Sequence, residues 1–460
     1  MDYFSNDEEK YINKGNKRKS FFPFVVFLCV LALGAVFYAV KDDIFSESYF
    51  GPGMSTEAKI ESDTSDVVET TKKKSNKRDD GNIETISKEE NLAASEENVG
   101  AGEENVEAVE KNVEAVNDRQ VGAKFTSPSV TNKFIETQNQ NKDTLAFAGD
   151  IYFSKRNINA YDASGINGVL DQKYIDIIDN HDFFVGNLEC CLTDAEQAID
   201  KEFTFKISPK YVSILKEMHL DLVTVANNHA MDFGETGFLE TLESLKTENI
   251  AYVGGGKDQA EATKPYVLEL NGRRYAIISA TCVVPNTNWF ATSDKAGLNS
   301  GYYGNAVCNQ IKKIKDKVDK VIVYIHWGVE KDTVSNEEQQ TLGRKFVDFG
   351  ADLVVGTHSH RLQEVEYYND VPIVYGIGNF IFGSTWTDTE VLSVTFDYAD
   401  GAEGLTKIKL IPGTCGYELT SPLSTEQKQY KFVEENIIPK SPTCVLDDDG
   451  FIIKNNTIIE

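Results

Sequence analysis

Positive charge is scarce in this chain. Lysine and arginine together number 46 against 73 aspartates and glutamates, so the net charge at pH 7 is −27. Proteins that bind nucleic acid through its phosphates need clustered basic residues, and this charge balance argues against a nucleic-acid partner. An acidic protein also repels other polyanions unless metal ions intervene.

Cysteine is sparse, and its spacing matches no known zinc motif or CxxC pair. Six of the seven cysteines follow residue 40: Cys190, Cys191, Cys282, Cys308, Cys415 and Cys444. Disulfides are permitted outside the cell but are not required there. We therefore expect buried cysteines that act as small apolar residues, and leave open one disulfide among them.

One long uncharged run, residues 21–40, reads FFPFVVFLCVLALGAVFYAV. Twenty such residues are long enough to cross a bilayer as a helix. Five basic residues precede the run, which indicates a cytoplasmic segment 1–20 and an exported remainder. The alternative is a cleaved signal peptide, but cleavage needs a small-x-small site, and Phe37 is too large for the first position of the nearest candidate. We predict a single-pass protein of the cell membrane with an uncleaved anchor.

Aromatic residues become rare after the anchor. Residues 41–142 are dominated by Ser, Glu, Asn, Lys and Asp, and include the degenerate repeat EENVGAGEENVEAVEKNVEAVND. Such a segment cannot bury enough apolar surface to offset the entropy lost on ordering. We predict that residues 41–142 form a disordered acidic linker.

From residue 143 onward, strand-like apolar runs alternate with helix-like amphipathic segments. This alternation is typical of an α/β domain with a buried sheet. The expected strands are 145–148, 183–188, 221–226, 275–280, 321–326, 352–356 and 373–377. The expected helices are 172–180, 208–218, 235–248, 305–318 and 336–349. We assign residues 143–390 to this domain and residues 391–460 to a β-rich extension of it.

Five of the expected strands run directly into residues that can bind a metal. In open α/β sheets, ligands collect at the carboxyl ends of strands, so we expect these residues to converge. Four of the six histidines lie in these loops. The residues are Asp150, Asn187, Glu189, Asn228, His229, Asp232, His326, His358 and His360.

Carboxylate, amide oxygen and imidazole together suit Zn²⁺, Mn²⁺ or iron ions. Two such ions about 4 Å apart can stabilise the attacking and leaving oxygens of a hydrolysis. In an extended strand, His358 and His360 would face opposite sides of the sheet. The chain therefore has to bend near Ser359 for both imidazoles to reach one site, and Gly356 precedes that bend.

Each loop also has a purely structural explanation. Asn227 and Asn228 are typical turn residues. Asp232 could cap the helix expected from residue 235, and His326 could be a packed histidine beside Trp327. The repetition of the pattern in five loops favours a common site over five unrelated explanations.

The motifs FAGDIYFS, GNLEC, VANNHAMDFGETGFLETLESL, VGGGKDQAEATKP, YIHWGVE and FVDFGADLVVGTHSHRLQEVEYYNDVPIVYGIGNFIF follow one another in this order. In residues and order they resemble the CapA family, the poly-γ-glutamate capsule biosynthesis proteins. The resemblance covers residues 143–385. It implies the fold of the calcineurin-like metallophosphoesterases, a two-sheet αββα sandwich.

The resemblance also implies roles for individual residues. His229 and Asp232 match the catalytic pair that protonates the leaving group. The implied metal ligands are Asp150, Glu189 as the bridging carboxylate, Asn228, His326, His358 and His360. The implied substrate contacts are Asn187, Asn227, Glu330, Arg361 and Asn379. Two departures from the phosphoesterase pattern, Tyr152 in place of a histidine ligand and Glu189 in place of aspartate, leave open whether one or two divalent ions bind.

Three functions are compatible with these residues. The first is a metal-dependent hydrolase or transferase that acts on an amide or phosphoester bond of poly-γ-glutamate or a related wall polymer. The second is a non-catalytic subunit of a membrane synthesis and export complex, which grips this anionic polymer through metal ions. The third is a general extracellular metallophosphoesterase.

Overall fold

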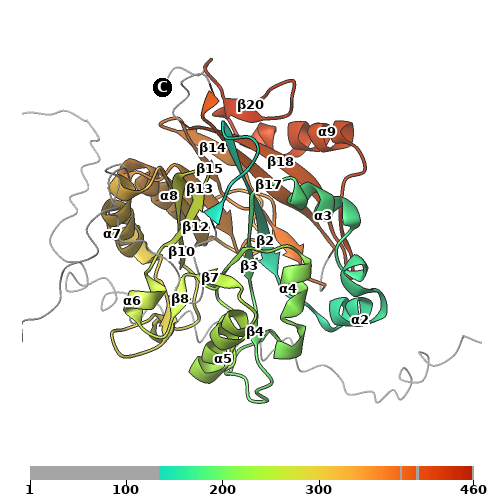
Figure 1. The fold of residues 1–460 in the computed structure, drawn as a ribbon, viewed down its shortest axis with the longest axis vertical. Helices are drawn as coiled ribbons and strands as arrows, with labels where there is room; N and C mark the ends of the chain where they lie inside the picture. Colours follow the sequence, from blue (N-terminus) through green and yellow to red (C-terminus); the bar gives the residue numbers. More distant parts are fainter. Residues whose placement is uncertain (1–133, 384–385, 400–403, 458–460) are drawn as a thin grey trace, which may run out of the picture. The chain divides into compact units, whose positions relative to one another are not determined.

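The computed structural model describes residues 134–383, 386–399 and 404–457 (Figure 1). The expected anchor, residues 21–40, and most of the expected linker lie outside these ranges. Within them, no helix combines the length and the apolar character needed to cross a membrane. Strand β1 (Phe134–Ile135) pairs with β9 (Tyr266–Leu270), and β2 starts at Lys142. Regular structure therefore begins inside the range assigned to the disordered linker, which corrects the end of that linker.

The first sheet has ten strands and a parallel centre. Its parallel strands are β2 (Lys142–Ile151), β3 (Phe183–Leu188), β6 (Leu222–Thr224), β7 (Ala251–Val253) and the short β16 (Asn379–Ile381) beside β2. Antiparallel strands complete it: β17 (Thr387–Asp397), β18 (Leu405–Cys415), β19 (Thr420–Pro422), β20 (Cys444–Leu446) and β21 (Ile452–Lys454).

The second sheet has seven strands in the order β1-β9-β10-β12-β13-β15-β14. Four of them run parallel: β10 (Arg273–Thr281), β12 (Lys320–His326), β13 (Leu353–Thr357) and β15 (Val371–Val374). Strand β9 is antiparallel to β10 and parallel to β1, and β14 (Val365–Tyr368) is antiparallel to β15.

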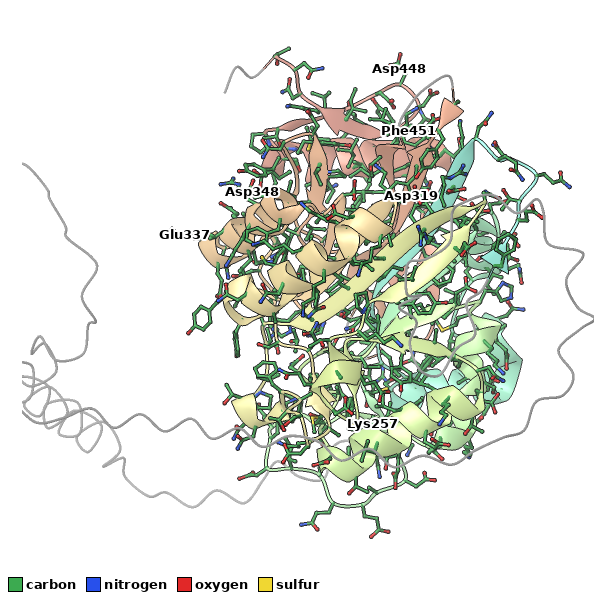
Figure 2. All side chains as sticks on the ribbon, turned by 60° about the vertical axis from the view of Figure 1, so that its left-hand side comes forward. Lys257, Asp319, Glu337, Asp348, Asp448 and Phe451 are labelled. Atoms are coloured by element: carbon green, nitrogen blue, oxygen red, sulfur yellow. The ribbon has the colours of Figure 1, made fainter. Side chains whose placement is uncertain are left out.

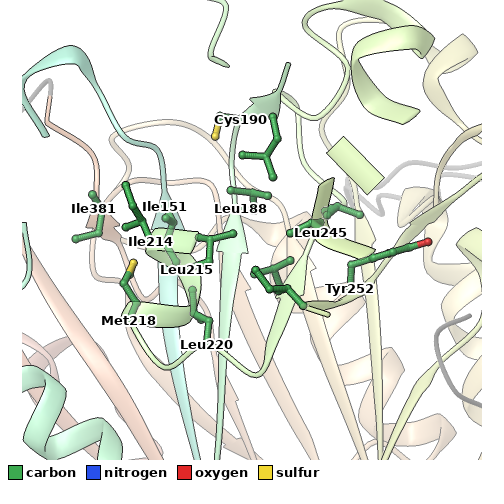
Figure 3. Packing of buried hydrophobic residues seen from close by; sticks show 14 of the residues in the cluster. Ile151, Leu188, Cys190, Ile214, Leu215, Met218, Leu220, Leu245, Tyr252 and Ile381 are labelled. Carbon is green, nitrogen blue, oxygen red and sulfur yellow. The ribbon is translucent and has the colours of Figure 1, made fainter. Parts of the chain in front are cut away.

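Three apolar cores show how these elements are layered. One core joins the two sheets and contains Leu145 and Phe147 of β2 together with Ile322 and Tyr324 of β12. A second lies between the first sheet and α3 (Gln172–Asp179), α4 (Ser213–Glu217) and α5 (Gly234–Thr247), and Figure 3 shows part of it. A third lies between the second sheet and α7 (Asn305–Ile314) and α8 (Glu337–Phe349). The order helix, sheet, sheet, helix confirms the expected two-sheet α/β architecture.

The sequence of β2 explains why this strand stands at the centre. Leu145 and Phe147 face the core between the sheets, while Ala146 and Ala148 face the helices. Side chains alternate along a strand, so a run that is apolar at every position fits a strand covered on both faces. Helix α8 has the other pattern: Leu342 and Phe346 are buried, whereas its charged side chains, such as those labelled in Figure 2, are exposed.

The remaining elements are short or lie toward the C-terminus. They are α2 (Lys155–Ser164), α6 (Gln259–Ala262), α9 (Glu426–Asn436), β4 (Cys191–Leu192), β5 (Lys206–Ile207), β8 (Gly255–Gly256) and β11 (Gly297–Leu298). Strand β17 crosses residue 390, so the range 391–460 continues the first sheet and adds α9 to the expected strands. All six cysteines among the described residues are unbridged, and all but Cys282 are buried, so the disulfide that the sequence left open is not formed among them.

Candidate metal centre

The polar residues at the strand ends converge where the parallel strands of both sheets finish. Asp150 is the last residue but one of β2, Glu189 follows β3, His326 is the last residue of β12, and His358 follows β13. Two groups of potential ligands form there, each with its ligand atoms within 4.8 Å of one another: Glu189 with His358 and His360, and Asp150 with Glu189 and His326. Glu189 belongs to both groups, which is the arrangement expected of a bridging carboxylate.

The surroundings of Glu189 show whether these residues fit a metal ion. Its side chain is fully buried, and among the described residues neither carboxylate oxygen has a hydrogen-bond partner. Burial, together with the charge of Asp150, raises the pKa of Glu189 well above its usual value. A buried carboxylate without donors costs several kcal/mol. Among the described residues, Nδ1 of buried His358 also lacks a hydrogen-bond partner. Unpaired carboxylate oxygens and an unpaired imidazole nitrogen therefore lie in one group, and both are atoms that divalent cations bind.

Asp150 is held in place by three donors. Nδ2 of Asn187 donates to Oδ1 at 2.8 Å, Nδ1 of His360 lies 3.1 Å from Oδ2, and the main-chain N–H of His358 donates to Oδ2 at 3.3 Å. Burial opposes ionisation, but the hydrogen bond and charge of His360, helped by the hydrogen bond from Asn187, outweigh it and lower the pKa of Asp150. The site therefore contains one firmly ionised carboxylate, Asp150, beside Glu189, whose ionised form needs a cation.

The imidazoles of His326 and His358 are neutral at neutral pH. Burial lowers the pKa of His326 well below its usual value, and burial with the charge of His360 lowers the pKa of His358 to about 3. Neutral imidazole is the form that binds metals. Nε2 of His326 lies 2.8 Å from Oδ1 of Asn228, and Nδ1 lies 3.0 Å from Oγ1 of Thr357. These contacts place Asn228 beside the ligand groups.

The chain bends sharply where the two histidines follow β13. His358 has φ +90° and His360 has φ +54°, both in the left-handed region that non-glycine residues seldom adopt. Such residues cost on the order of 1–3 kcal/mol each and persist where the surroundings enforce them. The bend brings His358 and His360 to the same side, and a bond from Oγ of Ser359 to the carbonyl of Arg361 at 2.8 Å supports it.

His229 and Asp232 form a buried pair next to the ligand groups. Nδ1 of His229 lies 2.6 Å from Oδ2 of Asp232. Asp232 also accepts hydrogen bonds from the main-chain N–H of Phe205 and from Lys201. Burial lowers the pKa of His229, and the hydrogen bond with Asp232 opposes that effect. Helix α5 has Phe233 as its N-cap, without a side-chain cap, so the explanation of Asp232 as a helix cap is wrong.

The residues expected to contact substrate divide into two sets. Asn187, Asn227 and Asn379 are at most 1% exposed, and their side chains form hydrogen bonds with other residues of the site. Asn227 connects Asn187 to the main chain of His229, and Oδ1 of Asn379 lies 2.7 Å from Nδ1 of His360. Their polar atoms therefore support other residues of the site. Glu330 is exposed, and Arg361 is partly buried.

Tyr152 occupies the position where a histidine ligand would stand in the phosphoesterase pattern. Its ring stacks on Phe205 at 4.1 Å and meets Phe382 edge-on at 5.6 Å, while Phe205 also stacks on His229 at 3.9 Å. Burial, helped by the charges of Cys190 and Asp232, raises the pKa of Tyr152 to about 12. The position is thus part of an aromatic wall and of neither ligand group.

Sequence reasoning missed Lys201, Phe205 and Phe382. Lys201 and Phe205 lie in residues 193–205, which join β4 to β5 without regular structure. Phe382 follows β16, and its ring lies 4.7 Å from that of His360. The periodicity of apolar residues cannot single out a residue in a segment without helix or strand. Only the structure shows that these three residues lie beside the site.

Comparison with known proteins identifies the family. Residues 144–384, which contain all the ligand candidates, match the family model described as "Bacterial capsule synthesis protein PGA_cap". The chain belongs to this family. The match confirms the resemblance to CapA proteins that the ordered motifs indicate.

Similar proteins are known from several bacteria. The chain is 28% identical over 321 residues to the PGA biosynthesis protein CapA of Bacillus subtilis, a match covering 69% of this chain and 83% of that one. It is 30% identical over 264 residues to the capsule biosynthesis protein CapA of Bacillus anthracis, covering 56% and 64%. Among solved structures, the calcineurin-like phosphoesterase YfkN from Bacillus subtilis is 14% identical with a TM-score of 0.35, over 65% of this chain and 97% of that one.

Proposed function

We propose that this member of the capsule synthesis family is a metal-dependent hydrolase that acts on poly-γ-glutamate or a related anionic wall polymer. The observation that carries the proposal is Glu189, a buried carboxylate whose oxygens lack a hydrogen-bond partner among the described residues and which belongs to both ligand groups. A buried carboxyl can also be kept neutral by protonation, but Glu189 in addition lies within 4.8 Å of ligand atoms of Asp150 and of three histidines.

Six residues would hold one or two divalent ions of the Mn, Zn or Fe type: Asp150, Glu189, Asn228, His326, His358 and His360. Bound there, such an ion supplies positive charge that polarises the scissile bond and lowers the pKa of water. Asn187, Asn227 and Asn379 would position these ligands and His229 through their inward hydrogen bonds, since each is buried. Glu330 and Arg361 remain the proposed substrate contacts.

His229 would exchange a proton with the substrate. Asp232 lies 2.6 Å from Nδ1, so a proton on Nδ1 is held by the carboxylate, and Nε2 is the nitrogen left for the reaction. Protonated Nε2 can donate to a leaving group, and the carboxylate keeps the ring in one tautomer and orientation. Stacking on Phe205 restricts the ring further.

The proposed place of action is the outer side of the cell membrane. The uncharged run 21–40 would anchor the chain, and residues 41–133 would link the anchor to the folded domain. Two relatives are named for PGA biosynthesis and capsule biosynthesis, which supports a partner complex that synthesises or exports the polymer.

Full-length protein, freed of metal and then supplied with Mn²⁺, should be assayed on poly-γ-glutamate and on p-nitrophenyl phosphate. We expect polymer cleavage that His229→Ala abolishes. His219→Ala is the matched control, because His219 is exposed and bonds Asp179. Phosphatase turnover without polymer cleavage would instead support a general phosphoesterase. Mn²⁺ binding without any turnover would support a non-catalytic polymer-binding subunit.

A further inference from the structure

Lys201 reaches into the site from the segment that joins β4 to β5. Its ammonium donates to the main-chain carbonyl of Asn228 at 2.6 Å and to Oδ1 of Asp232 at 2.8 Å. Nδ1 of His229 lies 3.1 Å away. The side chain of Lys201 is 17% exposed, and that of Asp232 is fully buried. One lysine therefore contacts three candidate site residues, Asn228, His229 and Asp232.

Asp232 is bonded by several residues of this segment. Its main-chain carbonyl accepts from the N–H of Ile199 at 2.9 Å, and its two carboxylate oxygens accept from Lys201 and from the N–H of Phe205 at 2.7 Å. Three residues spread along the segment thus bond one aspartate. Phe205 is thereby fixed between the rings of His229 and Tyr152.

Hydrogen-bond chemistry decides what Lys201 does at His229. An ammonium group can only donate, and a carboxylate can only accept. The shorter contact, 2.6 Å to Oδ2 of Asp232, uses a proton on Nδ1. The contact between the ammonium of Lys201 and Nδ1 of His229 is therefore electrostatic and is not a hydrogen bond. The two hydrogen bonds of Lys201 are those to Asp232 and to the main chain of Asn228. Without Lys201, Oδ1 of the buried Asp232 would lose its charged donor.

We propose that Lys201 is a positioning residue of this site: it fixes Asp232 and the main chain of Asn228, and through them the tautomer and orientation of the His229 ring against Phe205. This role rests on the proposed function, because it matters for turnover only if His229 takes part in the reaction. Loss of residues that orient site groups typically costs 10- to 100-fold in activity.

The test compares three variants of the full-length protein. Lys201→Met removes the ammonium, and Lys201→Arg keeps the charge and a donor. Lys206→Met is the matched control, because Lys206 belongs to the adjoining strand β5 and its ammonium bonds the carbonyl of Ala195 and not Asp232 or Asn228. The first readout is the imidazole ¹⁵N spectrum of metal-free protein, with the His229 signals assigned by their loss in His229→Ala. The second is turnover of the polymer with Mn²⁺.

We expect wild type, Lys201→Arg and Lys206→Met to share the Nδ1–H tautomer of His229. In Lys201→Met we expect ¹⁵N signals of His229 that are averaged between the two tautomers. In Lys201→Met we expect the kcat to fall by about tenfold or more, with a smaller change in KM, and Lys201→Arg to recover most of it. If Lys201→Met keeps the wild-type His229 signals, or if Lys206→Met has the same effect, the role of Lys201 is refuted. Failure of wild type to bind Mn²⁺ in calorimetry would refute the proposed function instead, and the metal-free spectra would still decide the role of Lys201.

Discussion

Glu390 provides a quantitative test of the packing around the strand that carries Asp150. It lies on β17, the neighbour of β2, and is 1% exposed. Among the described residues its Oε2 has no hydrogen-bond partner. Burial raises the pKa of Glu390 from 4.5 to about 8, and the charge of Lys440 opposes the rise. Glu390 is therefore mainly protonated at neutral pH in the folded protein.

The sign of the effect follows from the raised pKa. Below pH 4.5, Glu390 is protonated in both the folded and the unfolded chain, and its contribution to stability is fully present. As pH rises toward 8, the unfolded chain ionises freely and the folded chain resists, so the free energy of unfolding falls. A shift of the Glu390 pKa from 4.5 to about 8 corresponds to a loss on the order of 5 kcal/mol in the free energy of unfolding. Total stabilities of 5–15 kcal/mol are usual, so such a loss is large.

The assay is urea unfolding of the full-length protein at pH 5 and pH 9, followed by circular dichroism. Glu390→Gln has a similar shape but cannot ionise, so we expect it to match wild type at pH 5 and to exceed it by several kcal/mol at pH 9. Glu426→Gln, a change on exposed α9, is the matched control and should follow wild type at both values. If Glu390→Gln shows the same difference from wild type at pH 5 and pH 9, Glu390 is not the buried, protonated group described above.

Three further predictions concern the site and its frame. Mn²⁺ at about 100 times its Kd should stabilise wild type by about 3 kcal/mol and Glu189→Gln by much less, as thermal unfolding with and without Mn²⁺ would show; equal stabilisation would contradict the role of Glu189. In Gly356→Ala the new β-carbon would lie 2.1 Å from the carbonyl oxygen of Tyr375, so we expect a loss of about 3 kcal/mol or more in urea unfolding, and a loss below 1 kcal/mol would contradict the close packing. Arg273 donates two bonds of 2.6 Å to the buried carboxylate of Asp143, so Arg273→Met should cost about 3–5 kcal/mol, and a neutral effect in the same assay would contradict it.

The sequence was informative wherever apolar runs ended in polar residues. The strand expected at 183–188 coincides with β3, and the expected helix 336–349 differs from α8 by one residue. The ligand candidates converge because parallel strands in both sheets end at the same place. That arrangement follows from the α/β pattern, which explains why the positions of Asp150, Glu189 and His326 could be inferred before the structure was known.

Other features depend on tertiary contacts that leave no local pattern. Asp232 precedes a helix and so fits the pattern of a helix cap; only the structure shows that its side chain bonds His229 and Phe205 instead. Asn187 has the polarity of a substrate contact, yet burial turns its amide toward Asp150. The short β1 was assigned to the linker because its pairing with β9 joins residues more than a hundred positions apart.

The proposed function depends most on Glu189 coordinating a cation that it shares with the histidines. Crystals of the full-length protein soaked in Mn²⁺ and measured at the manganese absorption edge would test it directly. We predict an anomalous peak within bonding distance of a Glu189 oxygen and of at least one of His326, His358 and His360. Full density for these side chains, with no anomalous peak beside Glu189 at saturating Mn²⁺, would contradict the claim.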